Sequence, residues 1–164
     1  MEKVLTLVVK LDTSTEQSSR VNDTAQAFAS ACSWINQNVD PNLANRNSVQ
    51  AVCYRDVKSQ FGLTANHVVR ACAKVAANRQ TAKQTGLRIK GCKSTGFDCD
   101  QRTFSFREKD WAVSVSTIGK RLRLPLRASN YHRGKLSGRK PTSAQICLHG
   151  DGCWYAHIQL KSTP

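Results

Sequence analysis

The apolar positions in the first half of the chain predict one strand followed by helices. Residues 4–11 form a short β-branched run, VLTLVVKL, which is typical of a strand. Apolar residues then recur at steps of three and four, which predicts one long helix that ends before Pro41. The residues of this apolar face are Val21, Ala25, Phe28, Cys32 and Ile35. Thr13 and Glu16 have the spacing of a capping box at the helix start.

Two further helices follow, each with its own apolar stripe. Ser48 is the candidate N-cap of the second helix and Gly62 is its candidate C-cap. The third helix is expected to begin at Thr64 and to end at Gly86. The stripes consist of Val49, Val52, Cys53 and Val57 in the second helix and of Val68, Cys72, Val75 and Ala76 in the third. The Gly-rich, basic residues 86–103 are predicted to form a loop.

The second half of the chain alternates apolar and polar residues, which predicts half-buried strands. The last two strands are expected to form a hairpin across the turn Gly150-Asp151-Gly152. A basic loop, residues 127–142, is expected before that hairpin. The five predicted strands are residues 103–107, 111–118, 121–126, 143–149 and 153–160.

This order of elements predicts an α+β fold. An isolated first strand needs a neighbour, and pairing with the late strands would close a small antiparallel barrel of the OB-like kind. The three helices would then be an insert after the first strand. The expected units are a barrel of residues 1–12 and 102–164, a helical insert of residues 13–85 and a basic linker of residues 86–101.

Charge suggests what such a fold would bind. The 164 residues include 25 Lys and Arg against 11 Asp and Glu, a net charge of +14. Residues 1–50 carry a net −1 and residues 51–164 a net +15. This asymmetry in a folded chain favours a polyanionic partner, and a basic solubilising surface is the alternative. The sequence has no apolar run long enough for a membrane span and no secretory signal, so a cytoplasmic location and no membrane partner are expected.

The seven cysteines do not show the spacing of a metal site. No CxxC or CxxH pair occurs, and the number is odd, which argues against a disulfide framework. Most of them lie among apolar residues, where a thiol packs as a small hydrophobic group. They are Cys32, Cys53, Cys72, Cys92, Cys99, Cys147 and Cys153. We therefore predict buried thiols, with no metal and no cofactor.

Candidates for catalysis are few. The GxSxG, Walker and HExxH motifs are all missing from the sequence. Asp98 and Asp100 lie in a predicted loop, and His149 and His157 would face each other across the last hairpin. A purely structural histidine pair is the competing interpretation. We expect this chain to carry no active site of its own.

Basic side chains that could neutralise phosphates occur in four stretches. Arg121 and Arg123 alternate with leucines, so both should project from one face of the sheet, as a groove that tracks a phosphate backbone requires. A solvated outer face is the alternative. The candidates are Arg70, Lys74, Arg79 and Lys83 on the third helix, Lys90 and Lys93 after it, Arg102, Arg107, Arg121 and Arg123 on the strands, and Arg133, Lys135, Arg139 and Lys140 before the last hairpin.

Aromatic and small polar residues complete the candidate set. Tyr54 and Tyr131 lie beside basic residues and are candidates for stacking on bases. Ser48 and Asn66 lie near helix starts, where they could reach base edges or phosphates. For both of them, helix capping is the competing role.

The order of the motifs resembles the start of transposon-encoded TnpB proteins, which are RNA-guided DNA endonucleases related to the small type V CRISPR effectors. The strand with VVKL, the turn with TEQ and the helix ending SACSWINQN resemble that family's first strand, EQ turn and helix. VVRACAKVAAN resembles its A-L-R-x-L-x-x-A helix, and GLRIKGCKS its G-x-P-x-F-K-S loop. TFSFR, GKRLRLPL and GCWYAHIQL resemble its later strands. The resemblance covers almost the whole chain.

The resemblance implies a β-barrel wedge domain with a helical recognition insert. It implies binding of a guide RNA and of a short motif beside the target in double-stranded DNA. In that family a RuvC-like nuclease domain follows this region, so the expectation is a nuclease-free module that works with a nuclease-bearing chain or domain. By position, contacts to the DNA motif would fall near two groups of residues: Ser48, Cys53, Ala65, Asn66 and Val69, and Ser105, Phe106 and Arg107.

Three hypotheses therefore remain open. The first is a TnpB-like module that binds guide RNA and target DNA. The second is a stand-alone basic RNA-binding protein, either ribosome-associated or regulatory. The third is an enzyme with an unrecognised site around Asp98, Asp100, His149 and His157.

Overall fold

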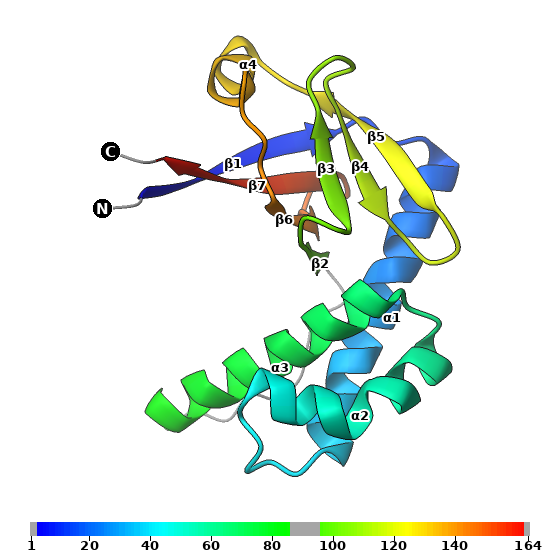
Figure 1. Cartoon of the computed structure of the whole chain (residues 1–164). Coiled ribbons are helices and arrows are strands. Elements are labelled where there is room, and N and C mark those ends of the chain that lie inside the picture. Colours follow the sequence, from blue (N-terminus) through cyan, green and yellow to red (C-terminus); the bar gives the residue numbers. More distant parts are fainter. Residues whose placement is uncertain (1–2, 86–95, 163–164) are drawn as a thin grey trace.

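The computed structural model describes residues 3–85 and 96–162. In these residues one strand precedes three helices, and six strands with a short fourth helix follow (Figure 1). The α+β class expected from the sequence is confirmed. The strands are β1 (Lys3–Leu11), β2 (Gly96–Cys99), β3 (Phe104–Arg107), β4 (Ala112–Ser116), β5 (Arg121–Arg127), β6 (Ser143–Leu148) and β7 (Trp154–Ser162), and the helices are α1 (Thr15–Asn38), α2 (Arg46–Phe61), α3 (Ala65–Thr85) and α4 (Asn130–Leu136).

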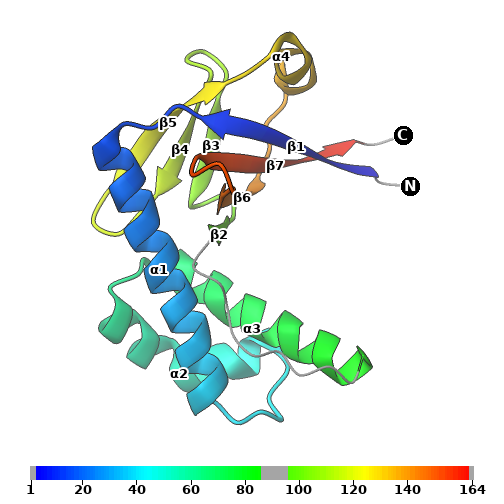
Figure 2. The same ribbon diagram turned by 180° about the vertical axis from the view of Figure 1, so that it is seen from behind.

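The seven strands form one antiparallel sheet in the order β2-β6-β7-β1-β5-β4-β3. β1 pairs with β7 through eight residue pairs but with β5 through only two, Lys10 with Arg127 and Leu11 with Leu126. The short β1–β5 junction joins two parts of the sheet, which curls into a half-barrel (Figures 1 and 2). The predicted pairing of the first strand with the late strands is therefore confirmed, and β2 and β3 lie at the two ends of the strand order.

Helix α1 connects the sheet to the other helices. Its first turns lie beside the sheet, and α2 and α3 pack around its far end (Figures 1 and 2). All five residues of the predicted apolar face, from Val21 to Ile35, are at most 1% exposed. They belong to one core cluster with residues of α2, α3 and the inner face of the sheet. Burial of this stripe explains why a 24-residue helix is stable here.

The helix ends differ in detail from the sequence predictions. The capping box at α1 uses Ser14 and Gln17, one residue later than Thr13 and Glu16: the Gln17 N–H donates to Ser14 Oγ at 3.2 Å, and the Ser14 N–H donates to Gln17 Oε1 at 3.1 Å. Asn45, not Ser48, caps α2. The predicted C-cap at Gly62 is confirmed by its left-handed φ of 66°.

Two predicted loops contain regular structure. β2 lies within the stretch 86–103, which was predicted to be a loop, and within the expected linker 86–101. A strand forms there because the segment pairs with β6 and buries Phe97 and Cys99. The rest of that linker, residues 86–95, lies outside the described residues. Helix α4 lies within the expected loop 127–142, and its one buried residue is Leu136. In the described parts of the chain, no helix has the length and apolar character needed to cross a membrane.

Candidate nucleic-acid interface

The outer face of β3, β4 and β5 carries serine and arginine side chains in register. Ser105 of β3 lies opposite Ser114 of β4, which lies opposite Arg123 of β5. The next row places Ser116 opposite Arg121. The alternate residues of these strands, such as Leu122 and Leu124 of β5, are buried in the core. Alternation therefore separates an apolar inner face from an outer face of hydroxyl and guanidinium groups.

Arg121 lies across this outer face rather than projecting freely from it. Its Nε donates to Ser114 Oγ at 2.5 Å, and Nη1 donates to Ser116 Oγ at 3.3 Å and to the Arg102 carbonyl at 3.0 Å. Nη2 donates to Ser105 Oγ at 3.5 Å. The residue is nevertheless exposed, so the guanidinium is held in one orientation while its outer side faces solvent. These bonds use four of the five N–H donors, so one Nη2 N–H and the positive charge remain for a phosphate oxygen.

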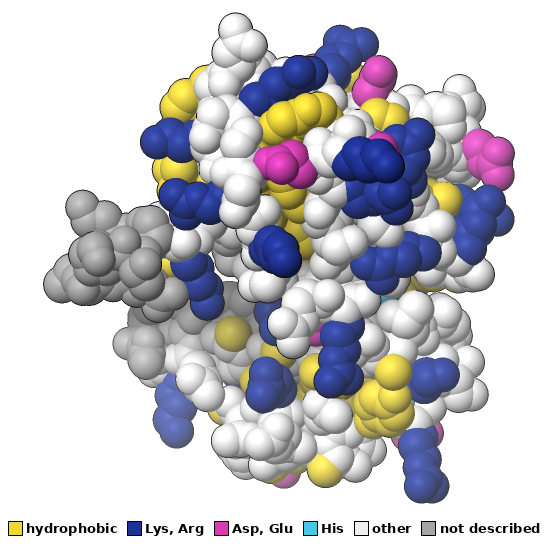
Figure 3. All heavy atoms as spheres, turned by 45° about the horizontal axis from the view of Figure 1, so that its top comes forward, with side chains coloured by type: hydrophobic (Ala, Val, Ile, Leu, Met, Phe, Trp, Pro, Cys, Tyr) yellow, Lys and Arg dark blue, Asp and Glu magenta, His cyan; other side chains and the backbone are white. Residues whose placement is uncertain are grey.

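Few acidic groups oppose the positive charge of this face. Arg102 and Arg123 are exposed, and no described carboxylate forms an ion pair with them or with Arg121. Arg107, at the far end of β3, pairs with Asp110 at 3.1 Å. Figure 3 shows Lys and Arg side chains spread over this side of the molecule, on the sheet and on the helices, with few acidic side chains between them.

Helix α4 adds a second group of predicted residues. Arg133 lies over the Trp111 ring, with 5.0 Å from its guanidinium carbon to the ring centroid, and this contact fastens α4 to the β3–β4 turn. Trp111 has a φ of 49°, rare for an aromatic residue, and its ring also contacts Phe106. Tyr131 is 58% exposed, and Lys135 Nζ lies 5.8 Å from its ring centroid.

On α3, the predicted residue Arg79 serves the fold. Its guanidinium reaches the C-terminal end of α1, where the last carbonyls lack helical partners. The shortest bonds are 2.8 Å from Nη2 to the Val39 carbonyl, 2.8 Å from Nη1 to the Leu43 carbonyl and 2.9 Å from Nη1 to the Asp40 carbonyl. Further bonds reach the carbonyls of Ile35 and Asn36 and the Asn36 side chain. With its donors used in this way, Arg79 has little capacity left for a phosphate.

Lys74 also has partners within the protein. Its Nζ lies 3.8 Å from Asp98 Oδ1 of β2 and 5.8 Å from the centre of the Phe28 ring of α1. Arg70, one turn earlier, is half-buried, and its Nε has no described hydrogen-bond partner. Lys83 is exposed near the end of the helix. Lys90 and Lys93 lie outside the described residues.

The other helical candidates make modest contacts. Ser48 and Asn66 are half-buried, and the Ser48 N–H lies 3.4 Å from the capping oxygen of Asn45. Tyr54 is half-buried against the core and lines a hollow on the outside of α2. Cys53 is 1% exposed, so nucleic acid could reach it only if α2 separated from α3.

The helices and the sheet meet at His67. This residue of α3 is fully buried, and its Nε2 donates to the Ser116 carbonyl at 2.8 Å. The carbonyl can only accept, so Nε2 carries the proton and Nδ1, which has no described partner, is the free acceptor. Burial lowers the pKa of His67, because a charged imidazolium would be poorly solvated there.

The two candidate catalytic histidines meet, as the sequence predicted. His149 Nε2 and His157 Nε2 are 2.8 Å apart across the β6–β7 hairpin, so the N–H of one ring donates a hydrogen bond to the unprotonated nitrogen of the other. Burial, with the neighbouring His149, lowers the pKa of His157. His149 also stacks on Tyr155, whose hydroxyl donates to Asp151 at 2.6 Å.

The candidate carboxylates do not join this pair. Asp98 accepts a 2.8 Å bond from Gln145, and Asp100 accepts from the backbone N–H groups of Arg102 and Thr103 in a turn. Over residues 3–85 and 96–162, no three His, Cys, Asp or Glu side chains are arranged to hold a metal ion. Both carboxylates thus have hydrogen-bond partners other than the two histidines.

Cysteine side chains contribute to packing, mainly among α1, α2 and α3. Four of the six described cysteines, Cys32, Cys53, Cys72 and Cys99, are buried as predicted, whereas Cys147 and Cys153 are only half-buried. Cys92 lies outside the described residues. The sulfur atoms of Cys53 and Cys72 are 3.7 Å apart between α2 and α3. Burial raises the pKa of the Cys72 thiol to about 12, so it stays protonated at neutral pH.

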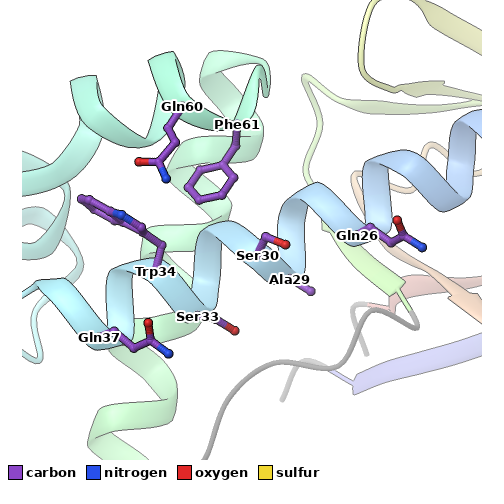
Figure 4. Close-up of a pocket in the computed structure, with 8 residues that line it drawn as sticks. All are labelled: Gln26, Ala29, Ser30, Ser33, Trp34, Gln37, Gln60 and Phe61. Atoms are coloured by element: carbon purple, nitrogen blue, oxygen red, sulfur yellow. The ribbon is translucent and has the colours of Figure 1, made fainter.

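A polar hollow of about 590 Å³ lies between α1 and the end of α2 (Figure 4). Trp34, Gln60 and Phe61 extend toward it, and hydroxyl and amide side chains of α1 border it. No lining residue ionises in the neutral pH range, so the hollow offers hydrogen bonds and ring faces but no charge. The lining residues are Gln26, Ala29, Ser30, Ser33, Trp34, Gln37, Gln60 and Phe61.

Of the three serines that hold Arg121, Ser105 was predicted as a site residue, but Ser114 and Ser116 were not. Ser114 and Ser116 occupy the polar positions of the alternating segment WAVSVSTI, so their place on the outer face was readable from the sequence. Their pairing with Arg121 depends on the register between β4 and β5, which the sequence alone does not give. A search with protein-family models and a search of curated proteins each found no match to the chain.

Proposed function

We propose that this chain binds nucleic acid through the outer face of β3, β4 and β5, as a module of a TnpB-like, RNA-guided DNA-targeting system. The observation that carries the proposal is Arg121, exposed and yet held across the sheet by three serine hydroxyls, beside the exposed Arg123. A surface needed only for solubility has no use for a guanidinium fixed in one orientation. A phosphate backbone does, because a fixed donor loses less entropy on binding.

In this proposal the curled sheet is the wedge barrel, OB-like in kind, and α1 to α3 are the recognition insert. The sheet face and α4 bind the scaffold of a guide RNA, and the starts of α2 and α3 approach the motif beside the target in double-stranded DNA. Base pairing by the guide reads the target, and the protein reads shape and a short motif. The chain itself does not cut DNA, a nuclease-bearing chain or domain supplies that activity, and the setting is a prokaryotic cytoplasm.

The test is to purify the chain at moderate salt and to sequence the RNA that comes with it. The proposal expects one enriched, structured RNA, and it expects Arg121→Gln with Arg123→Gln to lose that RNA. Arg46→Gln with Lys58→Gln removes the same charge from α2 and should retain it. A mixture of ribosomal and transfer RNA fragments, the same for all three proteins, would instead favour a stand-alone RNA-binding protein. Cleavage of DNA by the chain with Mg²⁺ alone would favour an enzyme.

A further inference from the structure

A small basic pocket lies where the segment after α4 meets the end of β7. Its volume is about 160 Å³, well below the roughly 300 to 1,000 Å³ of sites for drug-sized ligands. Three of its lining side chains are basic, Arg139, Lys140 and Lys161, and none is acidic. Its size and charge therefore suit a small anionic group. The remaining lining residues are Pro141, Thr142, Ser143, Gln159 and Leu160.

The walls of the pocket are held by defined contacts. Ser143 Oγ and Gln159 Oε1 are 2.6 Å apart across the β6–β7 pair. Arg139 Nη1 lies 3.4 Å from the Lys161 carbonyl, and the Arg139 N–H donates to the Leu136 carbonyl at the end of α4. In the described chain no ion pair involves the three basic residues. The nearby carboxylate of Glu108 is bound to the Gly138 N–H at 2.6 Å.

The helix leading into the pocket presents an aromatic ring to solvent. Tyr131 and Lys135 are four residues apart and share one side of α4, and Arg139 follows one further turn along the chain. Tyr131 is 58% exposed, a large apolar surface with no described role in the core. Exposed aromatic rings beside cations can stack on unpaired bases, whereas the bases of a duplex are already stacked on one another.

We propose that this pocket binds a backbone phosphate of a single-stranded nucleic acid, with Tyr131 stacking on a base of the same strand. The inference deepens the proposed function and rests on it, since it adds a second, single-strand contact separate from the Arg121 face. It also assigns a binding role to Lys161, which sequence reasoning did not select.

The experiment measures the binding of labelled oligouridine to the full chain over a series of salt concentrations. Arg139→Gln with Lys161→Gln should weaken binding and reduce the slope of log affinity against log salt by about 0.7, the value for one phosphate of a single strand. Arg55→Gln with Lys58→Gln removes the same charge from the exposed side of α2 and should change the slope less. Equal changes in the two variants would overturn the pocket.

The stacking part has its own readout. Tyr131→Leu should lower the affinity for oligouridine by about tenfold without changing the salt slope, because stacking releases no counterions. Tyr131→Trp should keep the affinity. Urea unfolding of each variant shows whether the fold is intact. An unchanged affinity for Tyr131→Leu would overturn the stacking contact.

Further ligands separate this inference from the proposed function. Oligodeoxyuridine that binds as tightly as oligouridine supports phosphate recognition, and weaker binding supports an added contact to the 2′-hydroxyl. If the wild-type chain binds both strands and the pocket variant behaves like its control, the pocket fails and the proposed function stands. If the chain binds inorganic phosphate but no nucleic acid, both fail.

Discussion

On α3, the guanidinium of Arg79 donates to a series of backbone carbonyls at the end of α1. On β5, the guanidinium of Arg121 lies over serine hydroxyls and stays exposed. Both residues belong to the same basic second part of the sequence, and both were predicted to bind phosphate. In the helical half of the molecule, α1 to α3, the cation binds backbone carbonyls within the protein. In the sheet half, the seven strands with α4, the cation faces solvent.

The difference shows that basic residues of one sequence can have different roles in the structure. A cation near a helix end can donate all its hydrogen bonds to the last carbonyls, which lack helical partners. A cation on an alternating strand is held away from the core by the pleat, so it faces solvent unless another element covers it. Lys74 of α3 supports the comparison, since it too has partners within the protein, Asp98 of β2 and the Phe28 ring of α1.

Loss of the Arg79 side chain should have the largest effect. We expect Arg79→Ala to lower the free energy of unfolding by about 2 to 3 kcal/mol, because several bonds from a charged donor are lost together. Urea unfolding followed by far-ultraviolet circular dichroism measures this. Lys83→Ala, one turn along α3 and exposed, is the matched control and should stay within about 0.5 kcal/mol. A small effect at Arg79 would end the distinction between the two halves.

The contact between the halves at His67 predicts a pH dependence. Because its pKa is lowered in the folded state, the unfolded state binds the proton more readily, and stability falls as the pH drops below about 6.5. The free energy of unfolding should be constant above about pH 7. Below that pH, the titration of this one group should lower it by up to about 1.4 kcal/mol per pH unit.

The control for this prediction is His67→Gln, which keeps a donor for the Ser116 carbonyl but does not titrate. We expect its unfolding to depend less on pH between about 5 and 7. His157 also has a lowered pKa and titrates in the same direction, so some dependence should remain. An identical pH profile in the variant and the wild type would show that His67 does not hold the halves together as a neutral ring.

The smallest effect is expected for the exposed ion pair between the halves. Lys120 Nζ lies 3.8 Å from Glu16 Oε1, and both side chains are more than half exposed. We expect Lys120→Gln to change the free energy of unfolding by less than about 0.5 kcal/mol, because water and salt screen such a pair. Unfolding at low and high salt measures it. A larger, salt-dependent loss would mean that charge pairing, rather than apolar packing and His67, joins the halves.

The elements that the sequence predicted well are those whose own residues build the core. The stripe of α1 and the alternation of β5 both record burial directly. β2 was missed because only Phe97 and Cys99 are buried in a four-residue strand that β6 stabilises from far along the chain. α4 was missed because a seven-residue helix with one buried side chain has no periodic pattern.

The candidate site was predictable to the same extent. Alternation placed Arg121 and Arg123 on one face, and the register then aligned Arg123 with Ser114. Nothing local to Arg79 shows that the end of α1 lies within its reach, because the two are brought together by helix packing. Long-range contacts therefore decide which basic residues are free to bind.

The central claim is that the sheet face, rather than charge in general, binds nucleic acid. The most direct measurement is the salt dependence of affinity for a structured RNA, in the wild type and in two variants of equal charge. Arg121→Gln with Arg123→Gln should reduce the slope of log affinity against log salt by about 1.4 to 1.8, the loss of two phosphate contacts. Arg46→Gln with Lys58→Gln on α2 should reduce it clearly less. Equal slopes for the two variants would contradict the account.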